Sequence, residues 1–198
     1  MCPFIETLRI ENGVIDNLNY HTERFNRTRS AFWNDSVPMN LADYIRPPAA
    51  DGILKCRIVY DEAVREVTYT PYAIRPVRSL RIVTSNTINY THKSTDREAL
   101  KGLFSQRETA DEVLIVRNGL LTDTSIANIA LYDGVNWFTP ATPLLKGTRR
   151  AALLDEHTLT EREIPVEQLF DYSYIALFNA MIDFGKILLP VSRETFVI

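Results

Sequence analysis

The second half of the chain is a series of short apolar segments separated by turns, and this pattern most restricts the possible folds. Asn118-Gly119 and Asp133-Gly134 are dipeptides that favour tight hairpin turns. The apolar segments around them are too short for ordinary helices and therefore predict strands. The predicted strands are Glu112–Val116, Leu120–Thr122, Ala127–Tyr132, Val135–Phe138, Tyr172–Phe178 and Ile182–Leu188. A β-rich lobe is expected here, with a short helix over Thr148–His157.

The first part of the chain mixes strands with helices. Leu18, Phe25 and Phe32 recur at intervals of seven, which predicts an amphipathic helix over 18–33. Strands are predicted at Phe4–Ile10, Ile53–Tyr60, Val64–Tyr72 and Leu80–Thr84, and a second helix at Pro38–Tyr44. Together the patterns predict an α+β fold of two lobes. The N-terminal α+β lobe covers residues 1–85, and the larger β-rich C-terminal lobe covers residues 86–198.

Composition narrows the class of protein. The 198 residues carry a net charge of −3, and hydrophobic and charged residues make up 45% and 24% of them, as in ordinary globular proteins. No apolar run approaches the ~20 residues of a membrane span, no signal peptide is visible, and 2 cysteines are too few for a disulfide framework or a zinc site. A cytoplasmic protein that binds neither metal, membrane nor nucleic acid is expected. Neither a G-x-G-x-x-G nor a Walker A loop occurs.

Lys93 is the lysine best placed for chemistry. It ends the polar stretch Ser85–Ser94, and Thr95 and Glu98 have the spacing of a capping box that starts a helix. A lysine ahead of a helix N-terminus meets the positive end of the helix dipole, which favours the neutral, nucleophilic amine. A solvated loop lysine would give the same pattern.

Three further patterns suggest an anion site and a buried acid. Gly147-Thr148-Arg149-Arg150 opens a helix, where free backbone N–H groups bind anions. Arg24 lies three residues after His21, beside the buried stripe of the first helix, and could reach inward to an anion. Asp123 lies in a run of hydroxyl residues between two strands. A helix junction, a surface arginine and a polar turn are the simpler interpretations. Together, however, a lysine, an anion site and an acid are what pyridoxal phosphate requires.

Five blocks in this order resemble the class IV aminotransferases, the fold-type IV pyridoxal phosphate enzymes. The blocks are His21-x-x-Arg24, Lys93-Ser-Thr-Asp-Arg97, Thr122-Asp-Thr-Ser-Ile-Ala-Asn128, Leu144-Leu-Lys-Gly-Thr-Arg-Arg150 and Asn179-Ala180-Met181. The resemblance runs from about Phe4 to the C-terminus. It implies a two-lobed fold like that of the D-amino-acid aminotransferases, pyridoxal 5'-phosphate as cofactor, and a homodimer.

The resemblance also implies roles for individual residues. Lys93 would form the Schiff base with the cofactor and act as general base. Arg24 would contact the cofactor phosphate, together with backbone N–H groups of Gly147, Thr148 and Arg149.

Two departures from the family pattern concern the acid and the start of the chain. Asp123 stands where the family usually has a glutamate facing the pyridine nitrogen, so its reach is one methylene shorter. Asn128 would hold that strand and the cofactor edge. The leading segment that usually precedes the part matching Phe4–Arg9 is missing, which concerns substrate recognition more than cofactor binding.

The resemblance leaves the reaction open. A lyase of folate biosynthesis, which converts 4-amino-4-deoxychorismate to 4-aminobenzoate and pyruvate, fits the Lys-x-x-Asp-Arg block best. An amino-acid transaminase of the branched-chain or D-amino-acid type is the alternative, and a non-catalytic ligand-binding descendant is a third. Arg57 or Arg97 would pair with a substrate carboxylate.

Overall fold

The computed structural model describes residues 2–197, which divide into two compact units. The first unit comprises the stretch up to Ile74 and the short segment His92–Asp96. The second comprises Arg75–Thr91 and the stretch from Arg97 onward. None of the helices in the described part is long and apolar enough to span a membrane.

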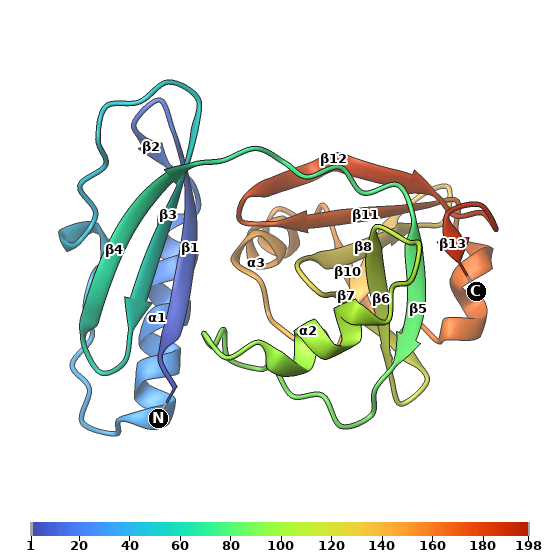
Figure 1. Ribbon diagram of the computed structural model, residues 1–198, viewed down its shortest axis with the longest axis horizontal. Coiled ribbons are helices and arrows are strands. Elements are labelled where there is room, and N and C mark those ends of the chain that lie inside the picture. The colour runs from blue at the N-terminus through green and yellow to red at the C-terminus, as the bar shows by residue number, and fades with distance from the viewer. Residues whose placement is uncertain (1, 198) are drawn as a thin grey trace. The chain divides into compact units, whose positions relative to one another are not determined.

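The first unit is one antiparallel sheet with a helix along one face (Figure 1). The strand order is β2-β1-β3-β4. The elements are β1 (Phe4–Glu11), β2 (Val14–Ile15), α1 (Leu18–Phe32), the 3-10 helix η1 (Leu41–Asp43), β3 (Ile53–Tyr60) and β4 (Val64–Pro71). Leu8, Phe25 and Ile58 are fully buried between α1 and the sheet. The alternation along β1 and the seven-residue spacing along α1 therefore produce this core.

The second unit is built on a larger mixed sheet, in the order β10-β9-β8-β7-β6-β5-β13, with β11 paired to β8 and β12 to β11. Its helices are α2 (Glu98–Ser105), which packs near β6, and α3 (Thr148–Asp155), which packs near β11. The strands are β5 (Leu80–Thr84), β6 (Glu112–Arg117), β7 (Leu120–Thr124), β8 (Asn128–Tyr132), β9 (Trp137–Pro140), β10 (Thr160–Arg162), β11 (Tyr174–Asn179), β12 (Ile182–Pro190) and β13 (Phe196–Val197). A second 3-10 helix, η2, spans Val166–Asp171.

The division between the units differs from the expected one at residue 85. The chain passes to the second unit after Ile74, and the Lys93 segment belongs to the first unit. Ile5 donates its backbone N–H to the carbonyl of Lys93 at 2.9 Å, and Thr95 donates its N–H to the carbonyl of Pro3 at 2.9 Å. These bonds attach the lysine segment to the beginning of β1.

Two local predictions were wrong. Helix α2 has no capping box, because its N-cap is Arg97 and the Thr95 hydroxyl donates to the carbonyl of Pro3 at 2.9 Å instead. The helix predicted at Pro38–Tyr44 is only the short η1, in which Asn40 Oδ1 accepts the N–H of Ala42.

Candidate functional site

A buried acid lies at the centre of the first unit. The Glu6 carboxylate is fully buried, and its Oε2 lies 2.6 Å from Nδ1 of His21. Arg24 binds the same carboxylate with two hydrogen bonds, from Nε at 2.9 Å and from Nη2 at 2.6 Å. Arg24 therefore reaches inward, as its position on the helix suggested, and the anion that it meets is Glu6.

The positions of these side chains follow from the local structure. Glu6 lies two residues from Phe4 and two from Leu8 along β1, so all three side chains point to the same face of the strand, toward α1. His21 and Arg24 lie one turn apart on the buried face of α1 and therefore reach the same carboxylate.

The charges in this cluster compensate one another. Burial by itself raises the pKa of Glu6, but the Arg24 charge and the hydrogen bonds from His21 and Arg24 outweigh it and bring the pKa to about 2. Burial lowers the pKa of His21, and the charges of Arg24 and Lys93 lower it further, against the effect of Glu6. The cluster thus holds an ionised glutamate beside a cationic arginine.

Lys93 is half-buried and lies in the same unit as this cluster. Its backbone is fixed by the bond from Ile5 and by a bridge between Phe4 and Ser94. Its charge contributes to the lowered pKa of His21. The structure therefore brings Lys93 and Arg24, two of the predicted site residues, into one unit with His21 and Glu6.

A second buried acid lies in the other unit, at the junction of β7 and β8. Asp123 pairs with Asn128 across the two strands, and Asn128 Nδ2 donates to Asp123 Oδ1 at 2.8 Å. The same Nδ2 donates to the carbonyl of Leu145 at 2.8 Å, while the N–H of Leu145 donates to Asp123 Oδ2 at 2.9 Å. These three bonds close a ring that joins both strands to the loop before α3.

Asp123 has the opposite electrostatic character to Glu6. Burial raises its pKa to about 6, and the hydrogen bonds from Leu145 and Asn128 and the charge of Arg150 only partly offset that effect. Its hydrogen-bond donors are neutral, so the ionised form lacks a directly bonded cation. Such a buried acid is suited to a cationic N–H group of a ligand.

The start of α3 is the predicted anion site. Its N-cap is Gly147, which provides no side-chain cap, and φ is −70° there, an angle open to any residue. A Cβ at this position would overlap Oδ1 of Asn128, so the need for glycine is one of space. Thr148 is buried, and Nε of Arg149 is buried without a hydrogen-bond partner. Arg150 serves the fold, because it binds the carbonyl of Pro140 and the carboxylate of Glu161.

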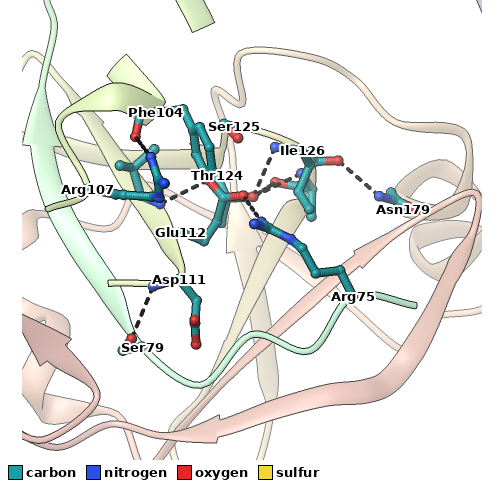
Figure 2. A network of polar contacts seen from close by, with 12 residues as sticks. Arg75, Ser79, Phe104, Arg107, Asp111, Glu112, Thr124, Ser125, Ile126 and Asn179 are labelled. Carbon is teal, nitrogen blue, oxygen red and sulfur yellow. Dashed lines mark hydrogen bonds and ion pairs between the residues drawn. The ribbon is translucent and has the colours of Figure 1, made fainter. Parts of the chain in front are cut away.

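The turn between Asp123 and Asn128 is held by side chains that lie far away in the sequence. Arg97 Nη2 donates to the carbonyl of Ser125 at 2.6 Å, and Asn179 Nδ2 donates to the carbonyl of Ile126 at 2.9 Å. Figure 2 shows the Asn179 amide directed at this turn. The two long-range bonds fix the ends of β7 and β8, and with them the acid.

The two predicted substrate arginines lie in different environments. Arg57 is on β3, on the sheet face opposite Glu6, where it pairs with Glu66 at 3.6 Å. It is not part of the cluster of Glu6, His21 and Arg24. Arg97 belongs to the second unit, together with Asp123 and its turn.

Three features of the site were not predicted: the Glu6 carboxylate, the Leu145 N–H and the contact that Asn179 makes through its side chain. Glu6 had a visible signal, because a charged residue on the inward face of a strand requires a buried partner. The other two depend on tertiary contacts. Among residues 2–197, no cluster of three or more His, Cys, Asp or Glu side chains could hold a metal ion.

Comparisons with known proteins show the family to which the chain belongs. The family model for amino-transferase class IV matches residues 4–189. An uncharacterized protein from Haemophilus influenzae is 37% identical over 185 residues, which cover 91% of this chain and 98% of that protein.

Solved structures extend the comparison to the fold. A crystal structure from Haemophilus somnus, provisionally assigned as a 4-amino-4-deoxychorismate lyase, has 35% identity and a TM-score of 0.85, and the match covers 92% of this chain and 97% of that one. A hypothetical aminotransferase from Mycobacterium tuberculosis in its PLP-bound form has 17% identity and a TM-score of 0.73, over 94% of this chain and 80% of that one, which supports the fold alone. The chain belongs to the class IV aminotransferases, a family of pyridoxal phosphate-dependent enzymes with the mixed α+β architecture of fold type IV.

Proposed function

We propose that the chain binds pyridoxal 5'-phosphate and converts 4-amino-4-deoxychorismate to 4-aminobenzoate and pyruvate. The observation that carries the choice of reaction is the match to the Haemophilus somnus protein, at 35% identity over nearly the whole of both chains. The aminotransferases among the similar structures fall below the identity at which a reaction can be inferred.

The residues of both units fit this cofactor. Gly147 leaves the start of α3 without a side chain, and no side chain caps the first turn of the helix, as expected where a phosphate binds the backbone N–H groups. Asp123, with a pKa raised to about 6, would be stabilised in its ionised form by a protonated ring nitrogen. An aromatic cofactor with a phosphate and a basic nitrogen meets both requirements.

The residues divide between three parts of the cofactor. Lys93 would bind the aldehyde carbon. The backbone N–H groups of Gly147, Thr148 and Arg149 would bind the phosphate. Arg24 would contact it as well, with its guanidinium shared between the phosphate and the Glu6 carboxylate, to which Nε and Nη2 are bonded. Asp123, held by Asn128, would face the ring nitrogen. When bound, pyridoxal phosphate supplies an electron sink for the bond that breaks.

The protein's own groups then move and hold protons. With the cofactor and substrate bound, Nζ of Lys93 would act as the base that removes the proton from the substrate carbon bearing the amine. Asp123 would keep the ring nitrogen protonated. The bond to the enolpyruvyl oxygen breaks, and the departing enolpyruvate takes up one proton to become pyruvate, so the atoms balance without added water. Arg57 or Arg97 would pair with a substrate carboxylate.

Borohydride trapping tests cofactor binding. The protein loaded with pyridoxal phosphate is reduced and digested, and the labelled peptide is identified by mass spectrometry. We expect the label on Lys93 and none after Lys93→Ala, while Lys101→Ala, a change at an exposed lysine paired with Glu98, leaves it in place. Label on another lysine, or no uptake of the cofactor, contradicts the proposal and favours a non-catalytic descendant.

A product assay tests the reaction. The loaded protein is incubated with 4-amino-4-deoxychorismate, and separately with several amino acids and 2-oxoglutarate. Release of 4-aminobenzoate supports the lyase, while formation of glutamate alone supports a transaminase. Arg57→Met and Arg97→Met are then compared, because loss of the arginine that binds the substrate carboxylate is expected to raise KM. The proposed homodimer is tested by light scattering.

A further inference from the structure

The contacts of Asn128 join the two functional parts of the second unit. Its Nδ2 lies 2.8 Å from Asp123 Oδ1 and 2.8 Å from the carbonyl oxygen of Leu145. Both of these atoms are acceptors, so the nitrogen must face them and Oδ1 must point the other way. That oxygen lies so close to the position of a Cβ at residue 147 that the two atoms would overlap.

Asn128 has little freedom to move aside. The residue is buried, and its amide is held by two hydrogen bonds to groups of different elements. A Cβ at position 147 would overlap Oδ1 and approach Cγ to 3.2 Å. Any rotation of the carboxamide that relieves the overlap would break one or both bonds of Nδ2. Gly147 and the amide of Asn128 are therefore mutually dependent.

The dependence extends to the acid. When Asn128 turns away, Asp123 loses its side-chain hydrogen-bond donor, and the carbonyl of Leu145 loses its side-chain partner. Leu145 is two residues before Gly147 in the loop that leads into α3. One amide therefore fixes both the acid of β7 and the backbone that opens α3.

We propose that Asn128 is a positioning residue that couples Asp123 to the turn at Gly147. One side chain would then place both the acid expected at the ring nitrogen and the turn expected at the phosphate. The link to cofactor binding rests on the proposed function. The coupling itself is a property of the protein without cofactor.

A double-mutant cycle tests the coupling. Thermal unfolding of the cofactor-free protein is measured for wild type, Asn128→Ala, Gly147→Ala and the double variant. We expect each single substitution to lower Tm by about 5 °C or more, because buried hydrogen bonds are lost. Once Asn128→Ala has removed the obstructing oxygen, Gly147→Ala adds little, and the double variant lies within about 2 °C of the worse single variant. Additive losses overturn the proposal.

Matched controls separate crowding from a general effect of the substitutions. Gly102 lies in α2 with no atom within 4 Å of an added Cβ, so Gly102→Ala leaves Tm unchanged or raises it. Asn136 is exposed in a turn, and Asn136→Ala has no coupling with Gly147→Ala. If Gly147→Ala proves as harmless as Gly102→Ala, the proposed obstruction is refuted.

The pH dependence of Tm distinguishes positioning from bulk destabilisation. Burial raises the pKa of Asp123 to about 6, so Tm falls as the pH rises toward that value and Asp123 ionises in its buried position. The Asn128 hydrogen bond favours the ionised form, so Asn128→Ala raises the pKa further and extends the fall in Tm to higher pH, while Asn136→Ala does not. An unshifted profile in Asn128→Ala refutes the link to Asp123. Cofactor uptake is followed separately by absorbance. Coupling without uptake contradicts the proposed function alone, whereas uptake with additive Tm losses contradicts this inference alone.

Discussion

Glu6→Gln removes one negative charge from the centre of the first unit while it keeps the size of the side chain. In the wild type the carboxylate is fully buried and accepts two bonds from Arg24, at 2.6 and 2.9 Å, besides its 2.6 Å contact with His21. The substitution removes the anion that Arg24 binds through Nε and Nη2, while the guanidinium stays buried. Breaking one partner of a buried ion pair costs about 3–5 kcal/mol of the free energy of unfolding.

The pKa of Glu6 gives a similar magnitude by a different route. The fall from 4.5 to about 2 is worth about 3 kcal/mol in favour of the ionised form. Because the pKa is lowered on folding, this contribution is complete above about pH 4.5 and is lost as the pH falls toward 2. We therefore expect Glu6→Gln to be destabilised at pH 7 and to resemble the wild type more closely near pH 3.

The assay can follow the first unit by itself. The chain has 2 tryptophans, Trp33 in the first unit and Trp137 in the second, so in a Trp137→Phe background the fluorescence reports only the first. At pH 7 a loss of 3 kcal/mol lowers Tm by about 6 °C or more. Glu66→Gln is the matched control, because Glu66 is exposed and its pair with Arg57 is worth at most about 1 kcal/mol.

Two results would refute the reasoning about Glu6. One is a free energy of unfolding within about 1 kcal/mol of that of the wild type, which is the range of a surface pair. The other is a loss that is equal at pH 3 and pH 7. The double variant Glu6→Gln, Arg24→Met recovers part of the stability if the loss of the Glu6–Arg24 pair is the cause.

Three further measurements test other parts of the structure. The pKa of Asp123 is raised to about 6, so the cofactor-free protein loses stability as the pH rises from about 4 through 6. Asp123→Asn abolishes this dependence of Tm on pH. The control Asp35→Asn, at an exposed residue, leaves it in place. Asn179→Ala removes three hydrogen bonds at the end of β11 and lowers the free energy of unfolding by about 1–3 kcal/mol, measured by urea titration; a loss below 0.5 kcal/mol contradicts the role of that side chain. The Cys2 thiol is exposed with a lowered pKa, and burial raises the pKa of Cys56 to about 11, so a thiol reagent modifies Cys2 in the native protein and Cys56 only after unfolding; equal rates contradict this.

The regular elements could be predicted because their signals are local. Alternation along β1 and β3 and the seven-residue spacing in α1 identify both the type of element and its buried face. The short strands β2, β10 and β13 have only two or three residues each, too few for a period to show. They exist because a neighbouring strand pairs with them.

The local surroundings of two predicted site residues could be inferred from the sequence for the same reason. A glycine before a helix and an arginine beside an apolar stripe are local patterns. In the structure Gly147 is the N-cap of α3, and Arg24 reaches inward to the carboxylate of Glu6. By contrast, two features could not be inferred from the local sequence: the unit to which Lys93 belongs and the cap of α2. Both involve hydrogen bonds from Thr95 to the carbonyl of Pro3, which lies about ninety residues earlier. Thr95 had a local partner in Glu98, but the carbonyl of Pro3 competes for the same hydroxyl and wins in the folded chain.

The two buried acids show how structural and functional roles can be separated. Glu6 and Asp123 are both buried on strands, yet folding lowers the pKa of the first to about 2 and raises that of the second to about 6. The difference lies in the donors, since Glu6 is bonded by the cationic Arg24 and Asp123 by the neutral Asn128 and the N–H of Leu145. A satisfied charge gives stability and has little to gain from a ligand, whereas an acid held in place with its charge poorly compensated gains from a cation. Of the two, Asp123 is therefore the acid that we propose for the protonated ring nitrogen, although its side chain is one methylene shorter than the usual glutamate.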